Sequence, residues 1–464
     1  MLSPVFIRNL KACLGEENVL LDPEDLICYS FDAASGIPPR KPGAVAIPRS
    51  REQVSEILRV CSRHGVPVYP RGSGTNLTGG TVPSPDGIVL SMVELSQILD
   101  IDAENLTATA EPGVVIDKLN KAVAQFGLMY PPDPGTVATC TLGGSVAECS
   151  GGLRGLKYGV TRDYVMGLEV VVADGSIIRV GGKTVKNVSG YDLTRLFVGS
   201  EGTLGIFTQI TVRLVPAPQA RRSMLAVFDS VDKAGQTVAD IIIHRVVPAT
   251  LEIMDDITIR SVEAYTPVGL PVGAAAVLFI EVDGYPEVVE REAGIVRDIC
   301  QTHQAQEVRV AKDEVERDRL WEARRVALPA LARVKPTTIL EDATVPRSKI
   351  PNMLSAIKEV ARKYSLTIGT FGHAGDGNLH PTILTDASNT EEMTRVKAAI
   401  EEIFQTALSL GGTLSGEHGI GIAKAEFMEW EFGPAGLDLM QRVKKAFDPQ
   451  NILNPGKVVR RAGD

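Results

Sequence analysis

Apolar and polar residues follow two periods along the chain, and the change between them separates two regions. In the first region, apolar residues spaced three and four apart predict a helix over residues 51–64. Short apolar runs and a second helical pattern follow, at 66–70, 88–92 and 116–126. Residues 167–173 and 177–180, joined by Asp174-Gly175, predict a hairpin. This half is therefore α+β, with long glycine-rich loops between its elements, and loops of that length in a compact domain are usually functional.

The second region begins after Val215-Pro-Ala-Pro218, which we interpret as a domain boundary. Its predicted strands and helices alternate as β-α-β-β-α-β, at 224–228, 232–245, 250–254, 274–282, 287–303 and 307–310. This order is the ferredoxin-like arrangement, and a related pattern follows from Ile339 to Leu384. We predict a first domain at 1–218 with a helical lead-in, a cap domain built on an antiparallel sheet at 219–450, and a C-terminal segment at 451–464 that returns to the first domain's site.

Composition narrows the function classes. The net charge of −9 over 464 residues disfavours a general nucleic-acid role. The N-terminus has no basic-then-apolar signal pattern and the longest apolar runs are too short to span a bilayer, so the expected location is cytoplasmic. Six cysteines without a Cys-x-x-Cys pair disfavour a disulfide framework and an iron–sulfur cluster in this chain.

The first glycine-rich loop, residues 71–80, has the composition of an anion site. Four glycines let successive backbone N–H groups turn toward one anion, while Ser73, Thr75 and Asn76 add donors and Arg71 adds positive charge. A pyrophosphate is the natural ligand. The spacing fits neither G-x-G-x-x-G nor a P-loop. On composition alone, a mobile loop without a ligand is the alternative.

Further glycine-rich pieces follow in the same region. They are Pro132–Gly135, Thr141–Ser145, Gly151-Gly152, Tyr158-Gly159 and Gly199–Gly205. Backbone packed this closely can enclose a flat ring and its sugar chain. One such piece is a weak signal, but several in one domain favour an extended dinucleotide lying across it.

Three of the six histidines lie in two short motifs, Gly372–His380 and Ser415–Gly419. His373 and His380 can face each other across a tight turn, and with Glu417 they make a divalent-metal set with open positions. His418, whose side chain ordinarily titrates near neutral pH, is the candidate base. The alternative is a pair of structural turns with hydrogen-bonded histidines.

The motif Pro70–Thr75 resembles the pyrophosphate loop of vanillyl-alcohol-oxidase-type flavoproteins. Residues 40–460 resemble the FAD-linked subunit of glycolate oxidase and its D-lactate dehydrogenase relatives. The resemblance implies an α+β fold, with a two-part FAD-binding domain of that type and a ferredoxin-like cap. Some relatives attach flavin through a histidine in or near this loop. The loop here contains none, and His64 is expected to end a helix, so non-covalent FAD is implied.

The motifs and the resemblance together give a set of candidate FAD-binding residues, of which Pro134, Thr141, Gly144, Glu201 and Ile206 match positions that line FAD in the family. The full set is Pro70, Arg71, Gly72, Ser73, Gly74, Thr75, Asn76, Gly79, Gly80, Pro134, Thr141, Gly144, Ser145, Gly151, Tyr158, Gly159, Glu201, Gly205, Ile206 and Asn454.

The family also implies roles for the second region. His373, His380 and Glu417 match its ligands for a divalent metal (Zn, Mn or Fe), His418 its catalytic base, and Arg324 its substrate-carboxylate arginine. Without the resemblance, a surface salt bridge is an equal explanation for that arginine. Asp376 is expected to brace the turn or a ligand imidazole.

Leu328 and Thr382 depart from the polar substrate contacts of the 2-hydroxyglutarate relatives, which weakens the case for a dicarboxylate. Lys335 is a further cation without an assigned place.

The predicted function is FAD-dependent oxidation of a small 2-hydroxy acid, D-lactate or glycolate, to the 2-oxo acid. The alternatives are a D-2-hydroxyglutarate dehydrogenase, a flavin subunit that only relays electrons, and a flavin-free binding protein. Because reduced flavin must pass its electrons onward, the resemblance also implies an iron–sulfur or electron-transfer flavoprotein subunit as a partner.

Overall fold

The computed structural model describes residues 2–459, which fold as two compact units. Unit 1 comprises Met1–Ser150, Val160–Ala217 and Glu417–Asp464, and unit 2 comprises Gly151–Gly159 and Pro218–Gly416. The unit changes inside the proline-rich segment that the sequence singles out. Two segments differ from the predicted ranges: 151–159 belongs to unit 2, and 417–450 belongs to unit 1. Residues 460–464 of the predicted C-terminal segment lie outside the described part.

The first sheet of unit 1 is small and mixed, and its strand order is β1-β2-β4-β3. The strands are β1 (Val19–Leu20), β2 (Ala44–Ala46), β4 (Ile88–Ser91) and β3 (Val68–Arg71). Helices α1 (Pro4–Leu14) and α3 (Arg51–His64) pack on its core. Ser50 caps the N-terminus of α3 through Gln53 N, and the helix ends at His64 as predicted, with Gly65 in the left-handed region.

The second sheet of unit 1 is antiparallel, with the order β5-β6-β10-β8-β9. Its strands are β5 (Ile98–Asp102), β6 (Thr107–Ala110), β10 (Ile206–Arg213), β8 (Val165–Val171) and β9 (Ile177–Gly181). The predicted hairpin is confirmed as the β8–β9 pair, in which Val171 faces Ile177. Val171 and Ile206 also reach the core under the first sheet, which joins the two sheets of this unit.

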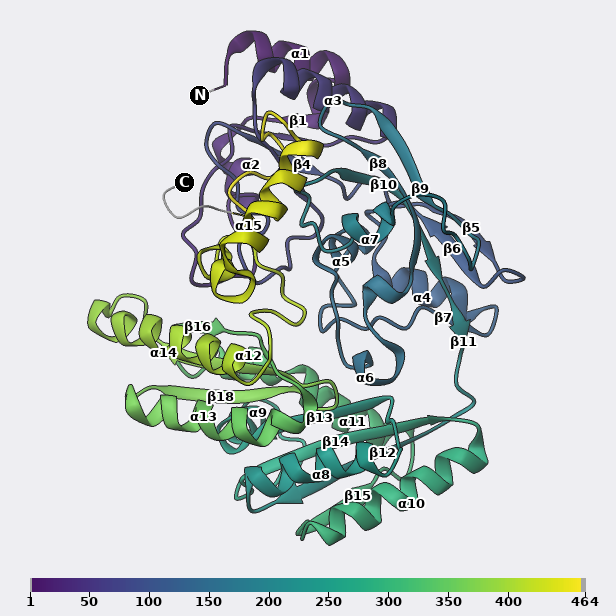
Figure 1. Cartoon of the computed structure of the whole chain (residues 1–464), viewed down its shortest axis with the longest axis vertical. Coiled ribbons are helices and arrows are strands. Elements are labelled where there is room, and N and C mark those ends of the chain that lie inside the picture. Colours follow the sequence, from purple (N-terminus) through teal and green to yellow (C-terminus); the bar gives the residue numbers. More distant parts are fainter. Residues whose placement is uncertain (1, 460–464) are drawn as a thin grey trace. The chain divides into compact units, whose positions relative to one another are not determined.

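Short helices and a C-terminal helix complete unit 1 (Figure 1). They are α2 (Pro23–Cys28), α4 (Ile116–Ala124), α5 (Leu142–Glu148), α7 (Leu193–Phe197) and α15 (Met428–Phe447), with a two-stranded pair of β7 (Leu128–Met129) and β11 (Val215–Pro216). Helix α15 is interrupted at Gly433. Lys444 near its end donates to the Thr203 carbonyl at 2.9 Å, which ties the helix to unit 1 rather than to the cap.

Unit 2 is built on one antiparallel sheet with the order β15-β12-β14-β13-β18-β19-β16, and β17 pairs with β19. The strands are β12 (Ala220–Phe228), β13 (Thr250–Asp255), β14 (Ala276–Gly284), β15 (Glu307–Val310), β16 (Thr337–Leu340), β17 (Ala343–Thr344), β18 (Thr367–His373) and β19 (Asn378–Thr385). The first four strands stand in the order 4-1-3-2, which confirms the predicted ferredoxin-like arrangement. The second half repeats the order 1-3-2 in β16, β19 and β18, as the related sequence pattern indicated.

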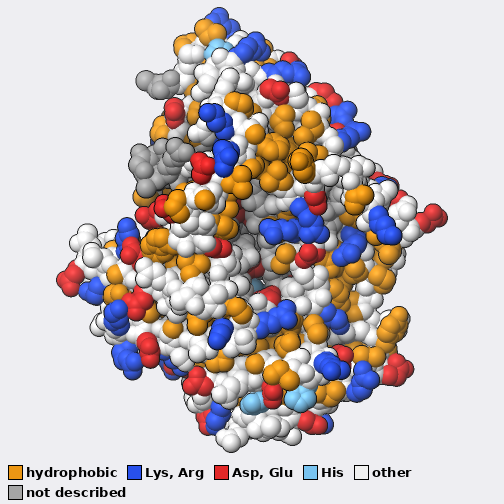
Figure 2. Space-filling view, viewed as in Figure 1, with side chains coloured by type: hydrophobic (Ala, Val, Ile, Leu, Met, Phe, Trp, Pro, Cys, Tyr) orange, Lys and Arg blue, Asp and Glu red, His pale blue; other side chains and the backbone are white. Residues whose placement is uncertain are grey.

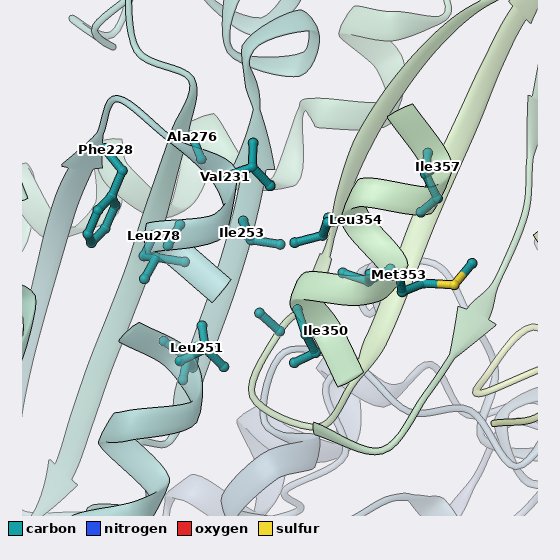
Figure 3. Close-up of a cluster of buried hydrophobic side chains, with 14 of the residues drawn as sticks. Phe228, Val231, Leu251, Ile253, Ala276, Leu278, Ile350, Met353, Leu354 and Ile357 are labelled. Carbon is teal, nitrogen blue, oxygen red and sulfur yellow. The ribbon is translucent and has the colours of Figure 1, made fainter. Parts of the chain in front are cut away.

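Helices cover both faces of this sheet. One face packs against α8 (Val231–Ile243), α10 (Pro286–Thr302), α13 (Ile350–Lys363) and α14 (Thr390–Ser409). Figure 3 shows part of this core, where Leu354 of α13 points toward Ile253 of β13. The other face packs against α9 (Asp256–Tyr265), α11 (Glu314–Arg325) and α12 (Ala327–Leu331). The sequence indicates a helix at Trp321–Arg324, within α11, whereas α9 and α12 were not predicted.

Strand parity decides which face carries the candidate chemistry. Ile253 lies in the first core and Met254 in the second, because successive strand residues point to opposite faces. Glu252 therefore shares the face of Met254. His373 likewise shares the face of Phe371, which packs in the same second core. The polar residues of the candidate site thus lie on the side of the sheet covered by α9, α11 and α12.

Candidate functional site

The first glycine loop leaves the end of β3 and is braced by its own arginine. Arg71 is buried, and its Nη1 donates to the Phe31 carbonyl at 2.6 Å and to Thr81 Oγ1 at 3.1 Å. Gly74 has a φ of +72°, and a Cβ there would collide with the Arg71 guanidinium. Arg71, which was predicted to supply positive charge to an anion, thus forms hydrogen bonds within the protein. Gly74 allows the loop to pass close to its guanidinium.

The second glycine stretch meets this loop at Thr141. A Cβ on Gly72 would collide with Thr141 Oγ1, and that oxygen also accepts from Gly144 N at 3.2 Å as the N-cap of α5. Ser145 is buried on the same helix, and its hydroxyl lies 3.1 Å from Thr161 Oγ1. Loops predicted from separate parts of the sequence therefore lie side by side in unit 1.

Glu201 connects the third glycine stretch to the C-terminal segment. It is buried with a φ of +49°, and its carboxylate accepts from Ile420 N at 2.6 Å and from Gly421 N at 2.8 Å. Asn454 Nδ2 donates to the carbonyls of Gly80 and Glu201, at 2.9 and 2.6 Å. Four segments that are distant in sequence are thus joined by hydrogen bonds within one unit.

Glu148 is a carboxyl at this junction that sequence reasoning missed. Burial, reinforced by the charge of Glu201, raises the pKa of Glu148 well above its ordinary value. A Cβ on Gly419 would collide with Glu148 Oε2, so the backbone after His418 passes directly over this carboxyl. Its sequence signal, one glutamate at the end of a short helix, is indistinguishable from that of a surface residue.

Other predicted flavin residues have packing roles. Ile206 is buried in β10, and a Cβ on Gly205 would collide with Val170 of the neighbouring strand. Tyr158 belongs to unit 2, where its hydroxyl donates to Asp283 Oδ2 at 2.7 Å, and Lys157 Nζ contacts Asp283 Oδ1 at 2.5 Å. Gly151 and Gly159 bound this same segment of unit 2.

The residues of unit 1 fit a bound dinucleotide. Pro70, Ser73, Thr75, Asn76, Gly79 and Gly80 remain together along one glycine-rich loop, with Pro134 on the neighbouring stretch. Among the described residues, Ser200 Oγ and Asn454 Oδ1 are buried without a hydrogen-bond partner. Unsatisfied buried polar atoms are rare in folded proteins, and a ligand that hydrogen-bonds them would account for both.

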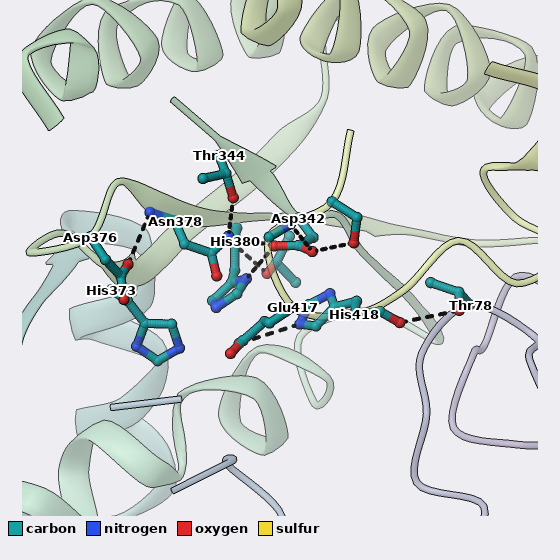
Figure 4. Close-up of polar contacts among 12 residues, drawn as sticks. Thr78, Asp342, Thr344, His373, Asp376, Asn378, His380, Glu417 and His418 are labelled. Carbon is teal, nitrogen blue, oxygen red and sulfur yellow. Dashed lines mark hydrogen bonds and ion pairs between the residues drawn. The ribbon is translucent and has the colours of Figure 1, made fainter. Parts of the chain in front are cut away.

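In unit 2, the two motif histidines meet at one end of the β18–β19 hairpin (Figure 4). Phe371 faces His380 and His373 faces Asn378 in the strand register. The imidazoles of His373 and His380 are perpendicular, with centroids 5.1 Å apart, and both residues are buried. Asp376 Oδ1 accepts from Asn378 N at 3.4 Å across the turn, which agrees with the expected bracing role.

One carboxylate connects His373 to the candidate substrate arginine. Glu252 of β13 is fully buried; its Oε1 lies 2.8 Å from His373 Nδ1, and its Oε2 lies 2.8 Å from Arg324 Nε and 2.6 Å from Arg324 Nη2. Because a carboxylate only accepts, His373 donates to Glu252 from Nδ1 in this contact. A histidine that ligates a metal commonly donates its other ring N–H to a carboxylate in this way, so the donor set fits a divalent cation.

A second buried carboxylate, Asp342, organises the His380 side of the hairpin. It accepts from Ser415 Oγ at 2.7 Å, from Gly416 N at 2.8 Å and from Asn378 Nδ2. Its Oδ1 lies 3.9 Å from His380 Nδ1. Asp342 thus fixes the end of unit 2 from which the chain continues into Glu417.

The Arg324 guanidinium contacts the Phe371 ring with its face and the Glu252 carboxylate with its edge. The guanidinium carbon lies 4.9 Å from the Phe371 ring centroid, a cation–π geometry. With Nε and Nη2 donating to Glu252, the Nη1–Nη2 edge is the one that can receive a ligand carboxylate. This buried arrangement removes the surface-salt-bridge explanation for Arg324.

The positions that depart from the family pattern are apolar or already paired. Thr382 is fully buried and donates to the His380 carbonyl at 3.2 Å, and half-buried Leu328 packs on the second core. Lys335 pairs with Glu392 at 2.8 Å, which gives that cation its place. None of these three side chains adds an uncommitted polar contact for a ligand.

Glu417 and His418 begin the last segment of unit 1. The His418 carbonyl accepts from Thr78 Oγ1 at 3.3 Å, which ties the segment to the first glycine loop. His418 Nε2 lies 3.8 Å from Glu417 Oε1, and both side chains are largely buried. Through Gly416, which Asp342 holds in unit 2, Glu417 is covalently adjacent to the histidine network.

Glu252 and Asp342 are the functional-site residues of unit 2 that the sequence analysis missed. Glu252 lies 121 positions from His373 in the sequence, and Asp342 lies 36 positions from Asn378. The one available signal is an acidic residue inside an apolar strand pattern, Leu251-Glu-Ile-Met254. Buried charges are usually paired, so such an interruption indicates a partner without identifying it.

Figure 2 shows lysine and arginine side chains interspersed with aspartate and glutamate over the visible face, which agrees with the small negative net charge. Among the described residues, we find no helix with both the length and the apolarity that a membrane span requires.

Two family models match this chain. Residues 42–181 match an FAD binding domain, and residues 217–458 match the C-terminal domain of FAD linked oxidases. The chain is 55% identical over 444 residues to the glycolate oxidase subunit GlcD of Bacillus subtilis (strain 168), covering 96% of this chain and 94% of the relative. It is 39% identical over 420 residues to a D-lactate dehydrogenase of Archaeoglobus fulgidus, covering 90% and 91%.

A solved structure shares the fold. The structure of p-cresol methylhydroxylase with substrate bound superimposes with a TM-score of 0.79 at 19% identity, covering 98% of this chain and 96% of that one. At that identity the likeness concerns the fold alone, and it confirms the predicted vanillyl-alcohol-oxidase-type architecture.

Proposed function

The chain belongs to the FAD-linked oxidases, and from this premise we propose that it oxidises a small 2-hydroxy acid of the glycolate or D-lactate type to the 2-oxo acid. The observation that carries the proposal is the grouping of Arg324, His373 and His380 on one face of one sheet, with Glu252 between the first two. A guanidinium suits a substrate carboxylate, and imidazoles suit a cation near its hydroxyl.

A short monocarboxylate fits the departures from the family pattern. Leu328 packs among apolar side chains, the Thr382 hydroxyl is committed to a backbone carbonyl, and Lys335 is committed to Glu392. A second carboxylate on the substrate would find no uncommitted donor at these three positions. We therefore favour glycolate and D-lactate over 2-hydroxyglutarate.

The roles of the chain's own residues follow from their chemistry. Arg324 binds the substrate carboxylate, and His418 takes the hydroxyl proton as general base. Bound FAD supplies the hydride acceptor. His373, His380 and Glu417 would hold a divalent metal, whose chemistry there is to lower the pKa of a substrate hydroxyl. Support for this set is the contact of His373 Nδ1 with the Glu252 carboxylate, the adjacent His380 imidazole and the direct chain connection of Glu417 to Gly416.

The direct test is a steady-state assay across a panel of 2-hydroxy acids with an artificial electron acceptor. We expect turnover with glycolate or D-lactate to exceed turnover with D-2-hydroxyglutarate. The reverse order would contradict the monocarboxylate assignment. An FAD-containing protein that oxidises no member of the panel would instead favour a subunit that only relays electrons.

We propose that the flavin is held without a covalent bond, since no histidine lies in the loop 71–80. The purified protein should be yellow, and acid or heat denaturation should release free FAD into the supernatant. Flavin that stays with the precipitated chain would contradict the proposal. Apo-protein that cannot be reconstituted with FAD would contradict flavin binding itself.

A partner for the reduced flavin belongs to the same proposal. The chain has six cysteines without a Cys-x-x-Cys pair, and its relative from Bacillus subtilis is named as a subunit. We expect slow reaction of the reduced chain with oxygen and faster turnover with an iron–sulfur or electron-transfer flavoprotein subunit. Rapid oxygen-dependent turnover by the isolated chain, with stoichiometric hydrogen peroxide, would overturn this part.

A further inference from the structure

Glu252 forms hydrogen bonds to both a candidate metal ligand and the candidate substrate arginine. Its two oxygens have different partners: Oε1 faces His373 Nδ1 at 2.8 Å, while Oε2 faces Arg324 Nε and Nη2 at 2.8 and 2.6 Å. The side chain is fully buried, so water does not compete for either oxygen. Each oxygen is therefore committed to one neighbour.

The local fold fixes this position from three elements. Glu252 lies on β13, which pairs with β18 through Ile253 and Gly372, so the strand pair brings it beside His373. Arg324 comes from α11, the helix that covers the same face of the sheet. Phe371 lies two residues before His373 on the same face of β18, and its ring stacks against the face of the Arg324 guanidinium. The strand pairing and the contacts with His373 and Arg324 thus define the position of the Glu252 carboxylate.

We infer that Glu252 is a positioning residue that selects the Nδ1–H tautomer of His373 and at the same time orients the Arg324 guanidinium. The two positioning roles follow from the hydrogen bonds described above. Their effects on metal and substrate binding rest on the proposed function. Through this one carboxylate, the ligand nitrogen that faces a cation and the donors that face a substrate carboxylate are set together. Loss of the carboxylate should therefore disturb both.

The substitution Glu252→Gln tests this with almost no change of shape. An amide has one acceptor oxygen and one donor nitrogen, so it cannot accept from both neighbours. The Arg324 donors are charged and form the stronger hydrogen bonds, so the amide oxygen should turn to them. The amide N–H₂ then faces His373 Nδ1, which can only accept in the Nε2–H tautomer. That tautomer has no free Nε2 lone pair for a metal.

Glu281 supplies a matched control in the neighbouring strand β14. It is also buried, and its Oε2 accepts from Ser223 Oγ at 2.6 Å and from Trp321 Nε1 at 3.0 Å. These hydrogen bonds involve neither His373 nor Arg324, although Trp321 lies on the same helix as Arg324. Glu281→Gln therefore reproduces the loss of one buried carboxylate charge in this sheet without touching the two site residues.

The first readout is the histidine tautomer, which needs neither metal nor turnover. Long-range ¹H–¹⁵N correlation spectra of metal-free protein, with His373→Gln used for assignment, report which ring nitrogen carries the proton. We expect Nδ1–H in the wild type and in Glu281→Gln, and Nε2–H in Glu252→Gln. A wild-type His373 in the Nε2–H form, or an unchanged tautomer in Glu252→Gln, would overturn the inference.

The second readout is binding. Zn²⁺ affinity measured against a chelator should fall about 10- to 100-fold in Glu252→Gln, as for other partners of ligand histidines, and remain unchanged in Glu281→Gln. Binding of oxalate, followed by the flavin absorbance, should weaken in the same variant. FAD content should stay at the wild-type level. Equal Zn²⁺ and oxalate affinities in wild type and Glu252→Gln would overturn the coupling of the two groups.

Failure of the proposed function gives a different result. A wild type that binds no Zn²⁺ and oxidises no 2-hydroxy acid, yet shows the tautomer change in Glu252→Gln, would refute the metal site and the activity while supporting the role of Glu252. A wild type that binds Zn²⁺ and turns over, with an unchanged tautomer in the variant, would refute the role of Glu252 alone.

Discussion

The two units build their candidate sites from different materials. In unit 1 the site is a set of loops whose close approach depends on glycine and on hydrogen bonds to backbone groups, as at Gly72 against Thr141 and Glu201 against Ile420 N. In unit 2 it is a set of side chains on regular strands and one helix, as with Glu252, His373 and Arg324. The first arrangement suits an extended ligand, and the second suits a small substrate.

The difference teaches where each unit is vulnerable. A loop site depends on backbone conformation, so adding a methyl group at a glycine should weaken it while deleting a side chain changes little. A strand site depends on buried charged partners, so an isosteric change of one carboxylate should alter its neighbours without unfolding the sheet. The predictions below test that contrast, beginning with the largest expected effect.

His418→Ala should lower kcat by about 100- to 10,000-fold, the usual range for loss of a general base. KM should change little, because the imidazole acts on the hydroxyl proton rather than on the carboxylate. The control is His244→Ala, an exposed residue at the end of α8. Steady-state kinetics at matched FAD content measure both. Near wild-type turnover in His418→Ala would remove the base assignment.

Arg324→Lys should raise KM about 10- to 150-fold, since a hydrogen bond to a charged group contributes about 1.5–3 kcal/mol. Lysine keeps one charge for Glu252 but loses the planar pair of donors. Arg324→Ala is the poorer test, because it leaves a fully buried carboxylate unpaired, which costs about 3–5 kcal/mol of stability. An unchanged KM in Arg324→Lys would show that the substrate carboxylate binds elsewhere.

The contrast between the units also explains what the sequence could predict. The loops of unit 1 can be recognised in the sequence because glycine, serine and threonine are concentrated within ten residues, as in 71–80. The strand order of unit 2 follows from the alternation of apolar runs and helical patterns, which the structure confirms for β12 to β15. Local sequence patterns were thus sufficient to predict the fold and the hairpin that contains His373 and His380.

Partners that are distant in sequence escaped prediction for a physical reason. Glu252 meets His373 because two antiparallel strands pair, and no local pattern specifies which strands pair. The same holds for Glu148, which contacts the backbone near Gly419. Helices α9 and α12 were also missed, since short amphipathic segments that follow or precede strands give weak periodic signals. Tertiary packing, rather than composition, decides these features.

Gly74→Ala tests the loop side of the comparison. Its φ of +72° costs an alanine about 1–2 kcal/mol, and the added Cβ also meets the Arg71 guanidinium. FAD affinity should therefore fall roughly 5- to 30-fold, as measured by fluorescence of released flavin. Gly65→Ala is the control, because Gly65 has a φ of +63° but nothing within 4 Å and no place in the loop. Equal FAD affinity in both variants would show that the loop tolerates distortion.

The smallest effect concerns a carboxyl of unit 2 that has backbone N–H partners instead of a cation. Asp255 accepts from Thr258 N at 2.9 Å and from Thr370 N at 2.8 Å, and burial raises its pKa to about 6. The folded state therefore binds this proton more tightly than the unfolded state does. The stability that Asp255 contributes is present below about pH 4 and declines as the pH rises toward 6.

Asp255→Asn removes this titration, so the free energy of unfolding of the wild type relative to the variant should fall by about 1 kcal/mol between pH 5 and pH 7. The chain has two tryptophans, Trp321 in unit 2 and Trp430 in unit 1, so a Trp430→Phe background makes fluorescence report unit 2 during urea unfolding. Glu252 provides the internal contrast, because its charge is balanced by Arg324 at 2.6 Å. A stability difference that stays constant between pH 5 and pH 7 would show that Asp255 is already ionised in the folded unit at pH 5, and that two backbone donors stabilise a buried carboxylate as well as a guanidinium does.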